Sequence, residues 1–237
     1  MRLRQATPFE LQWQEHLFEI PCHCPYGLDF VAVYRQLAWL TVPPSRMDDF
    51  LAAGFRRNGN TMYTMNCRGC KGCVPIRLRA ADFRPNRNQR RTWAANQDLL
   101  VNYDRLRVDE ERLALCDDFL AQRHSGRGSS ARDYYSGFFL NSIAETYEIT
   151  YRLDGRLLGL AVVDLAGNGL NAVYFFFAPD QARRSLGTFN ILYLIELCRR
   201  TGLEFLYLGY WIENVAAMSY KTRFKPYQLR RDGVWQE

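Results

Sequence analysis

Histidine and long apolar runs are both scarce in this sequence. Its 237 residues include only three histidines, His16, His23 and His124, and none belongs to a recognisable serine, histidine and acid triad. Nucleophilic catalysis of that type is therefore not expected. No stretch approaches the ~20 consecutive apolar residues of a membrane span, and the charged first ten residues are not followed by the apolar core of a signal peptide. The sequence predicts a cytoplasmic protein that does not bind a membrane.

Internal repeats and low-complexity segments are absent as well. Hydrophobic residues make up 48% of the chain and charged residues 24%, which is typical of a globular protein with a packed core. The length fits one or two domains of roughly 100–150 residues. The formal net charge is only +6, so RNA binding is expected only where other features agree with it.

Five of the seven cysteines form two groups. Cys67, Cys70 and Cys73 follow one another at three-residue steps, and Cys22 and Cys24 precede them. Cytoplasmic thiols stay reduced, so these residues indicate metal binding, catalysis or burial before disulfides. Four thiolates bind either zinc or an iron–sulfur cluster, and the spacing does not choose between them. The other interpretation is a turn in which the cysteines only pack.

Turn residues and hydrophobic periodicity predict a mixed order of helices and strands. The first half is expected to hold a hairpin over 55–63 around Asn58-Gly59, a strand over 74–78, a helix over 90–123 and a loop at Gly126–Ser130. The second half is expected to hold a helix near 138–143, a hairpin over 147–164 around Asp154-Gly155, strands over 169–177 and 205–208, a helix that Arg183–Thr188 opens and that runs to about Thr201 before Gly202, and a short helix near 214–221.

This order in the second half is that of the acetyltransferase (GNAT) core. The loop at Arg183–Thr188 opens a helix, and a helix N-terminus presents backbone N–H groups to phosphates. We therefore predict that Arg183, Arg184 and Gly187 bind an anionic part of the substrate. The alternative is an ordinary capped helix with two solvated arginines.

The end of the strand at 205–208 carries a third group of candidates. Tyr210 would place a hydroxyl near a reacting carbonyl, and Trp211 would offer an aromatic face to a terminal base. Lys221 follows in the next short helix. Without an enzyme nucleophile, attack by an amine of the substrate on an activated ester is the favoured chemistry, and Asp164 and Glu213 are the candidate proton acceptors.

The motifs together resemble the aminoacyl-tRNA–protein transferases of the N-degron pathway. The matching motifs are Cys24-Pro25-Tyr26, Gly54-Phe55-Arg56-Arg57-Asn58-Gly59 before Tyr63, Cys67-x-x-Cys70-x-x-Cys73-Val74-Pro75-Ile76-Arg77, Phe83-x-Pro85-x-Arg87-x-Gln89-Arg90-Arg91, Arg123-His124, Ala172-Val173-Tyr174, Arg183–Thr188, Leu206–Ile212, and Met218-x-Tyr220-Lys221 with Phe224-x-Pro226. They cover most of the chain in the order of the family.

The resemblance implies transfer of an amino acid from charged tRNA to the α-amine of a protein that begins with Asp or Glu. It favours leucyl-tRNA as donor, with arginyl-tRNA second, and it requires no cofactor. It also implies an α+β protein with an N-terminal cysteine-rich domain over 1–92 and an acetyltransferase-like α/β domain over 93–237, the helix at 90–123 contacting both.

The resemblance also suggests roles for the basic residues. Arg56, Arg57 or Arg77 would bind the acidic first residue of the acceptor, because arginine pairs with carboxylates in a bidentate contact. Arg87, Arg90 and Arg91, or Arg183 and Arg184, would contact the tRNA. The metal ligands would be Cys22, Cys24, Cys67, Cys70 and Cys73.

Two other functions compete with this one. The first is a non-catalytic RNA-binding or redox-sensing protein built on the cysteines. The second is an acetyl-coenzyme A-dependent acetyltransferase, because the loop arrangement is shared. The sequence Arg183-Arg184-Ser185-Leu186-Gly187-Thr188 lacks the second glycine of the Arg-x-x-Gly-x-Gly/Ala pattern, which disfavours the acetyltransferase.

Overall fold

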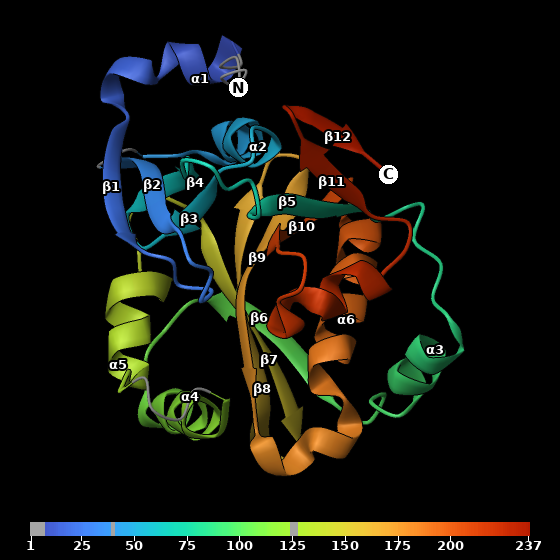
Figure 1. Cartoon of the computed structure of the whole chain (residues 1–237). Coiled ribbons are helices and arrows are strands. Elements are labelled where there is room, and N and C mark those ends of the chain that lie inside the picture. The colour runs from blue at the N-terminus through green and yellow to red at the C-terminus, as the bar shows by residue number, and fades with distance from the viewer. Residues whose placement is uncertain (1–7, 39–40, 124–127) are drawn as a thin grey trace.

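Two β-sheets form the framework of the molecule (Figure 1). The structure, a computed structural model, describes residues 8–38, 41–123 and 128–237. Within them the smaller sheet has the strand order β1-β2-β4-β3, and the larger sheet has the order β12-β11-β5-β10-β9-β8-β7-β6. The strands are β1 (Phe18–His23), β2 (Val31–Ala38), β3 (Arg56–Asn58), β4 (Thr61–Met65), β5 (Val74–Arg79), β6 (Leu100–Arg105), β7 (Thr146–Leu153), β8 (Arg156–Ala166), β9 (Gly169–Phe177), β10 (Phe205–Trp211), β11 (Gln228–Arg231) and β12 (Val234–Gln236). The expected α+β class is confirmed.

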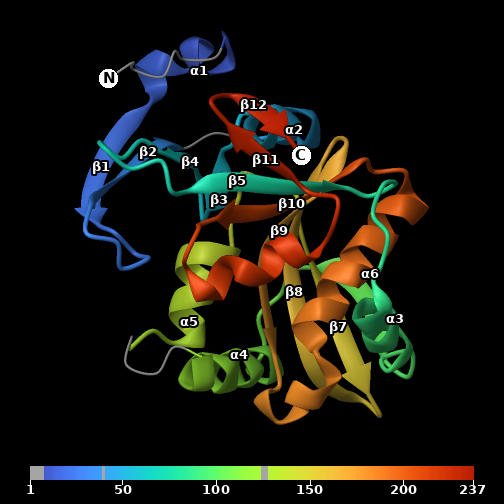
Figure 2. The same cartoon turned by 45° about the vertical axis from the view of Figure 1, so that its right-hand side comes forward.

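Helices cover both faces of the larger sheet (Figure 2). The helix α6 packs on β9 and β10 with α3 beside it, whereas α4 packs on β8 and β9 from the other side. The α-helices are α1 (Pro8–Gln12), α2 (Pro44–Ala52), α3 (Arg87–Ala94), α4 (Glu110–Arg123), α5 (Ala131–Tyr134) and α6 (Leu186–Thr201); the short 3-10 helices are η1 (Gln14–His16), η3 (Pro179–Arg184) and η4 (Ala216–Arg223), and η2 (Tyr135–Phe139) is a π-helical turn. No helix in the described part of the chain has the length and apolar character to cross a membrane.

The turns predicted from short local signals are confirmed. Asn58-Gly59 lies at the turn between β3 and β4, where Gly59 has φ +52°. Asp154 and Gly155 join β7 to β8 with φ +48° and +84°, as the two central residues of a tight hairpin require. Gly202 ends α6 in the left-handed conformation. Each of these features depends on a few neighbouring residues.

The continuous helix predicted over 90–123 is wrong. The segment instead forms α3, the strand β6 and α4. The helix α3 begins at Arg87 because Asn86 and Gln89 form a capping box. The strand β6 pairs antiparallel with β7 along the edge of the sheet. Its side chains are largely exposed, so pairing with a distant strand, and not hydrophobic periodicity, fixes its conformation.

The two predicted domains share the larger sheet. The strand β5 comes directly after the cysteines, within the predicted N-terminal domain, yet it lies between β10 and β11. A separate cysteine-rich module is therefore not shown, and the boundary at residue 92 stays a prediction. The helix predicted near 138–143 is wrong over most of its range, because the π-helical turn η2 ends at Phe139 and residues 140–143 are not helical. The predicted loop at Gly126–Ser130 falls partly on residues outside the described ranges.

The strands β9 and β10 separate at the centre of the larger sheet. They pair in parallel only over Phe205–Tyr207 and Gly169–Asn171, although β9 continues to Phe177. On its other side β10 changes register against β5 between Tyr207 and Tyr210, which is a β-bulge. This bulge and the separation of the strands interrupt the sheet at one place, and the candidate site lies there.

Candidate active site

Two cations meet at the bulge in β10. Gly209 has φ +87°, and a Cβ placed on it would lie 3.0 Å from Nη2 of Arg56 and 3.4 Å from Nζ of Lys221. Both charged groups therefore lie against the backbone of Gly209. Glycine is required here for two reasons, because it adopts the left-handed conformation readily and because it has no side chain to displace the cations.

Separate elements supply the two cations. Arg56 extends from β3, where it pairs with Tyr63 of β4, and Lys221 extends from η4 and donates a hydrogen bond to the carbonyl oxygen of Tyr210 at 2.6 Å. Arg56 is 7% exposed and Lys221 6% exposed. Lysine and arginine are almost never this buried unless they are paired with an anion.

The described residues supply no salt-bridge partner to this pair, although the Asp164 charge acts on Arg56 from a longer distance. Among residues 8–38, 41–123 and 128–237, neither Arg56 nor Lys221 forms a salt bridge. Burial, with the nearby Arg56 charge, lowers the pKa of Lys221 to about 7, and burial lowers the pKa of Arg56 as well. Both changes reflect the cost of holding uncompensated positive charge out of water. The arrangement favours an anionic ligand.

Tyrosines surround the cations. The rings of Tyr63 and Tyr210 lie 6.1 Å apart, and the Tyr210 hydroxyl donates to the carbonyl oxygen of Gly54 at 3.1 Å. Burial raises the pKa of both tyrosines, so they remain neutral. Two buried cations beside neutral phenols suit a small carboxylate better than a hydrated phosphate chain, because carboxylate oxygens match the guanidinium fork. We call this site the cation pocket, defined by Arg56, Lys221, Gly209, Tyr63 and Tyr210.

Arg57, the next residue along β3, points to the opposite face of the strand. Its Nε donates to Asp164 at 2.9 Å, and both side chains are fully buried. Asp164 also accepts hydrogen bonds from Thr146 at 2.6 Å and from Asn171 at 2.9 Å. Each carboxylate oxygen of Asp164 is therefore engaged within the protein. The geometry places Arg57 and Asp164 in the framework that fixes β3, away from the cation pocket.

Comparison with known proteins identifies the family. The model described as Arginine-tRNA-protein transferase, N terminus, matches residues 22–91, and the model described as Arginine-tRNA-protein transferase, C terminus, matches residues 111–231. The chain belongs to the arginine-tRNA-protein transferase family. The transferase is 42% identical over 218 residues to an aspartate/glutamate leucyltransferase of Pseudomonas fluorescens strain Pf0-1, a match that covers 89% of this chain and 93% of the relative. It is 35% identical over 219 residues to one of Chromobacterium violaceum, with 90% of each chain covered. It is therefore an aminoacyltransferase.

Two solved structures were compared with this transferase. The L-PGS from Bacillus licheniformis gives a TM-score of 0.48 at 13% identity and covers 96% of this chain and 88% of that chain. FemX gives 0.47 at 8% identity and covers 90% and 86%. Both TM-scores lie below 0.5, so the fold of the transferase rests on its own sheet topology.

Arg77, the third predicted ligand for an acidic residue, is held outside the cation pocket. Its guanidinium lies 3.8 Å from the centre of the Phe205 ring and 4.3 Å from that of Trp235. It also donates to Gln228 at 2.8 Å and to the Tyr207 hydroxyl at 3.3 Å. These contacts fix β5 against β10 and β11, and they occupy the guanidinium of Arg77 within the protein.

The residues predicted near the reacting carbonyl separate into buried and exposed positions. Tyr210 is buried in the wall of the pocket and Trp211 is half-buried beside it, whereas Glu213 is exposed just after β10. At the start of α6, Arg184 is paired with Asp98 through two contacts of 2.9 and 2.8 Å, while Arg183 is exposed. A Cβ on Gly187 would meet only Phe177, at 4.0 Å, so no close backbone approach requires glycine there.

The three arginines of α3 form an exposed basic face. Arg87, Arg90 and Arg91 are exposed and form no salt bridge within the described residues. Gln89, on the buried side of α3, donates to the carbonyl oxygen of Arg223 at 3.1 Å. This bond attaches α3 to η4, the helix that carries Lys221. We call the exposed surface of Arg87, Arg90 and Arg91 the α3 face.

The cysteines link two loops of the transferase. Burial and neighbouring Cys67, Cys70 and Cys24 raise the pKa of Cys73 to about 12. The backbone N–H of Val33 donates to Cys67 Sγ at 3.4 Å. Cys22 is exposed on β1. In the described ranges no group of three or more histidine, cysteine or acidic side chains is arranged to hold a metal ion. The predicted zinc or iron–sulfur site is therefore not shown and stays a prediction, and no step of the reaction is derived from it.

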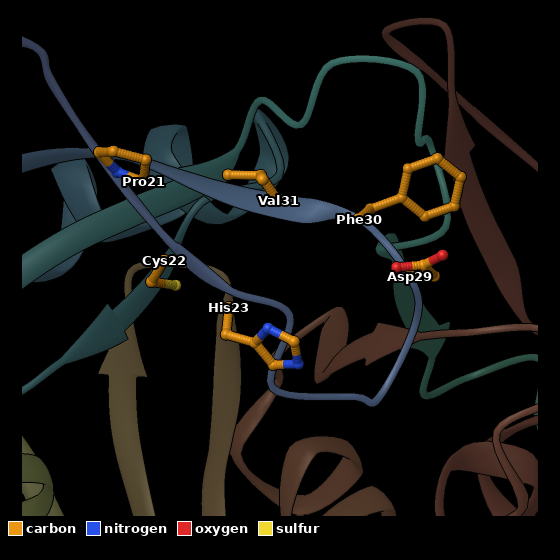
Figure 3. Close-up of a pocket in the computed structure, with 6 residues that line it drawn as sticks. All are labelled: Pro21, Cys22, His23, Asp29, Phe30 and Val31. Atoms are coloured by element: carbon orange, nitrogen blue, oxygen red, sulfur yellow. The ribbon is translucent and has the colours of Figure 1, made fainter.

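A hollow of about 440 Å³ lies at the connection between β1 and β2 (Figure 3). Its lining consists of Pro21, Cys22, His23, Asp29, Phe30 and Val31. None of these residues belongs to the cation pocket. The hollow is open and shallow, and it contains no pair of buried charges that would define a reaction centre.

Sequence reasoning named Arg56 and Lys221 but did not join them. It named Tyr210 but missed the part of Tyr63 beside the cations, and it missed Gly209 as the point where the cations meet. Two signals were available. Consecutive arginines on a short strand must point to opposite faces, and a glycine inside an aromatic strand indicates a bulge or a close approach.

Proposed function

We propose that this transferase moves leucine from leucyl-tRNA to the α-amine of proteins whose first residue is Asp or Glu, and that Arg56 and Lys221 bind the side-chain carboxylate of that residue. The buried cation pair at Gly209, with no carboxylate partner among the described residues, carries the proposal. Asp or Glu supplies the missing charge, whereas Asn or Gln does not. The names of the curated relatives support leucine and acidic acceptors.

The reaction needs no enzyme nucleophile. The α-ammonium group of the acceptor first loses a proton, and the nitrogen lone pair then attacks the carbonyl carbon of the leucyl ester. The new C–N bond forms, the nitrogen gives up a second proton, the C–O bond to the tRNA ribose breaks, and the ribose oxygen takes up a proton, so the products are the amide and the free ribose hydroxyl. Binding of the acceptor side chain by Arg56 and Lys221 would hold the amine in place, which makes its attack effectively intramolecular.

The charges around the site limit the choice of proton acceptor. The oxygens of Asp164 accept three hydrogen bonds, from Arg57, Asn171 and Thr146, which hold this fully buried carboxylate in the framework. Glu213 is exposed just beyond β10, and we propose it as the proton acceptor. Activity that is unchanged in Glu213→Gln would remove this assignment.

The donor is proposed to enter where β9 and β10 separate. This opening begins after Tyr207 and adjoins the bulge at Gly209, so an ester carbonyl there would face an amine held at the cation pocket. The interrupted sheet supports the acetyltransferase-like arrangement predicted from the order of elements. The tRNA itself is proposed to contact the α3 face, since three exposed arginines without carboxylate partners are suited to phosphates.

An acceptor series tests the proposal. The purified protein receives labelled leucyl-tRNA or arginyl-tRNA together with peptides that differ only in the first residue, which is Asp, Asn, Glu, Gln or Ala. We expect leucine transfer to the Asp and Glu peptides and little to their neutral isosteres. Equal transfer to Asp and Asn would contradict the carboxylate role, and transfer from arginyl-tRNA alone would assign the donor to arginine.

Replacement of Arg56 tests the pocket directly. Arg56→Met keeps most of the side-chain volume and removes the charge, and we expect kcat/KM for the Asp peptide to fall at least about 30-fold, as for loss of one partner of a buried charge pair. The ratio of kcat/KM for the Asp peptide to kcat/KM for the Asn peptide should fall toward one at the same time. Arg46→Met, at a half-exposed position of α2, is the matched control and should retain both. An unchanged ratio in Arg56→Met would exclude Arg56 from acceptor recognition.

A further inference from the structure

The smaller sheet connects the cation pocket to the molecular surface through one row of paired residues. Arg56 of β3 is paired with Tyr63 of β4, Tyr63 with Gln36 of β2, and Gln36 with Phe18 of β1. Paired residues on neighbouring strands place their side chains on the same face of a sheet. Phe18, on the outermost strand, therefore shares a face with the buried Arg56.

The next row on this face is apolar as well. Ile20 of β1 is paired with Tyr34 of β2, and the Tyr34 ring lies 5.2 Å from that of Tyr63. Exposure increases along the face, from 7% at Arg56, through half-buried Tyr63 and Tyr34, to 42% at Phe18 and 43% at Ile20. We call the surface of Phe18, Ile20 and Tyr34 the β1 strip.

The opposite face of the same sheet packs into the hydrophobic core. Leu37 and Met62, which are paired across β2 and β4, are buried there in the core formed with α2. That face accounts for the packing of the sheet, whereas the β1 strip contributes nothing to this core. Exposed aromatic and aliphatic side chains on an edge strand are a liability that proteins usually avoid, so their position beside the pocket calls for a ligand.

We propose that the β1 strip binds the acceptor protein around its fourth and fifth residues, with an apolar side chain of the acceptor placed on Phe18 and Ile20. This inference rests on the proposed role of the cation pocket. When the first carboxylate is held by Arg56, the rest of the acceptor chain must leave the pocket. Three strand spacings of roughly 4.8 Å separate β3 from β1, which is about the span of four extended residues at roughly 3.4 Å each.

The geometry therefore specifies an acceptor side chain at position four or five, since consecutive side chains of an extended chain point to opposite faces and only one of the two lies on the strip. A dipeptide that fills only the pocket would not reach the β1 strip. A pentapeptide would reach it, and its affinity would depend on whether its last two side chains are apolar. The charge at the first position would act at the cation pocket and the apolar contacts would act at the β1 strip. The contribution of each site to binding is therefore measurable without the other.

The test compares three acceptors with wild-type protein and with the double variant Phe18→Ser/Ile20→Thr. The acceptors are an Asp-Ala dipeptide amide, Asp-Ala-Ala-Leu-Phe amide and Asp-Ala-Ala-Ser-Asn amide. For wild-type protein we expect KM for the Leu-Phe peptide to be roughly tenfold lower than for the other two, the scale of burying one apolar side chain. In the double variant this advantage should shrink to less than about twofold, with the dipeptide unaffected.

Val31→Thr is the matched control, because Val31 is 64% exposed on the same hairpin but is paired with His23 on the other face. It should keep the full advantage. An advantage that persists in the double variant, or that is absent from wild-type protein, overturns the proposal. So does a concentration-dependent dimer that the double variant abolishes, since a second copy would then occupy the strip. Failure of the cation pocket would appear separately, as equal use of Asp-Ala and Asn-Ala dipeptides.

Discussion

Arg56 and Arg57 are neighbours in the sequence with opposite electrostatic surroundings. Arg57 is paired with Asp164, which makes it part of the protein framework. Arg56 reaches the bulge at Gly209 and meets Lys221 there, another cation. A protein gains no stability from two buried like charges. We interpret the arrangement as a binding site in which the ligand supplies the negative charge. Such a site lowers the folding stability of the protein in exchange for binding.

Lys221 should make acceptor binding depend on pH. Its pKa is lowered to about 7, so the pocket of the free enzyme has two cations below pH 7 and one above it. The KM for an Asp peptide should therefore rise several-fold between pH 6.5 and pH 8.5. Lys221→Arg remains charged throughout this range. The ratio of KM values for wild-type protein and Lys221→Arg cancels titration of the acceptor amine, and a ratio independent of pH would contradict the prediction.

The same pKa has a consequence for stability. A lysine with a pKa depressed on folding opposes folding increasingly as pH falls from its ordinary value of 10.5 to about 7, and the penalty is constant below that. Lys221→Met should thus be more stable than wild-type protein by about 1–3 kcal/mol at pH 6. The gain should shrink toward pH 10, as thermal unfolding at several pH values would show. The neighbouring tyrosines, Tyr63 and Tyr210, have raised pKa values and do not titrate in this range.

At the scale of elements, local signals were predictable and distant pairings were not. Asn58-Gly59, Asp154-Gly155 and Gly202 fixed turns and a helix end because their backbone preferences act within a few residues. The strand β6 was predicted as helix because its conformation comes from pairing with β7. The paired residues of the two strands are more than forty positions apart in the sequence. The pairing of Arg57 with Asp164 spans 107 positions, so no local pattern indicates it.

The bulge in β10 should be sensitive to a single methyl group. In Gly209→Ala the new Cβ would approach Nη2 of Arg56 to 3.0 Å and would also strain a backbone with φ +87°. We expect kcat/KM for an Asp peptide to fall by more than about 30-fold, because small misplacements of a positioned group are costly. Gly155→Ala is the control, since it has φ +84° with nothing within 4 Å of its Cβ. Both variants should lose comparable stability, about 1–2 kcal/mol, so thermal unfolding and activity separate the two effects. Equal activity losses would show that backbone strain alone is responsible.

At the scale of the molecule, the family was predictable but the assembly of the site was not. Motifs spread over most of the chain identified the transferase family, since they depend on residue identity alone. The cation pocket combines β3, β10 and η4, and β5 from the cysteine segment completes the sheet between β10 and β11. The cysteines were expected to define a metal site. Among the described residues they form no such group, and burial raises the pKa of Cys73 to about 12, which keeps its thiol neutral.

The α3 face gives a prediction about the whole complex with tRNA. Because the Gln89 bond to Arg223 attaches α3 to η4, a tRNA bound to Arg87, Arg90 and Arg91 would be fixed relative to Lys221. Changing these three arginines to glutamine should raise KM for leucyl-tRNA without changing the Asp-to-Asn ratio of the acceptor. Each lost phosphate contact should also lower the slope of log KM against log salt by about 0.7–0.9.

A second triple variant with the same change in net charge controls for non-specific attraction. Arg46, Arg132 and Arg156 lie on other elements and each is paired with an exposed carboxylate. Their replacement by glutamine should leave the salt slope within about 0.5 of the wild-type value, since these side chains are not proposed to contact phosphate. If both triple variants change the slope equally, the tRNA responds to net charge alone, and the α3 face has no specific part in binding it.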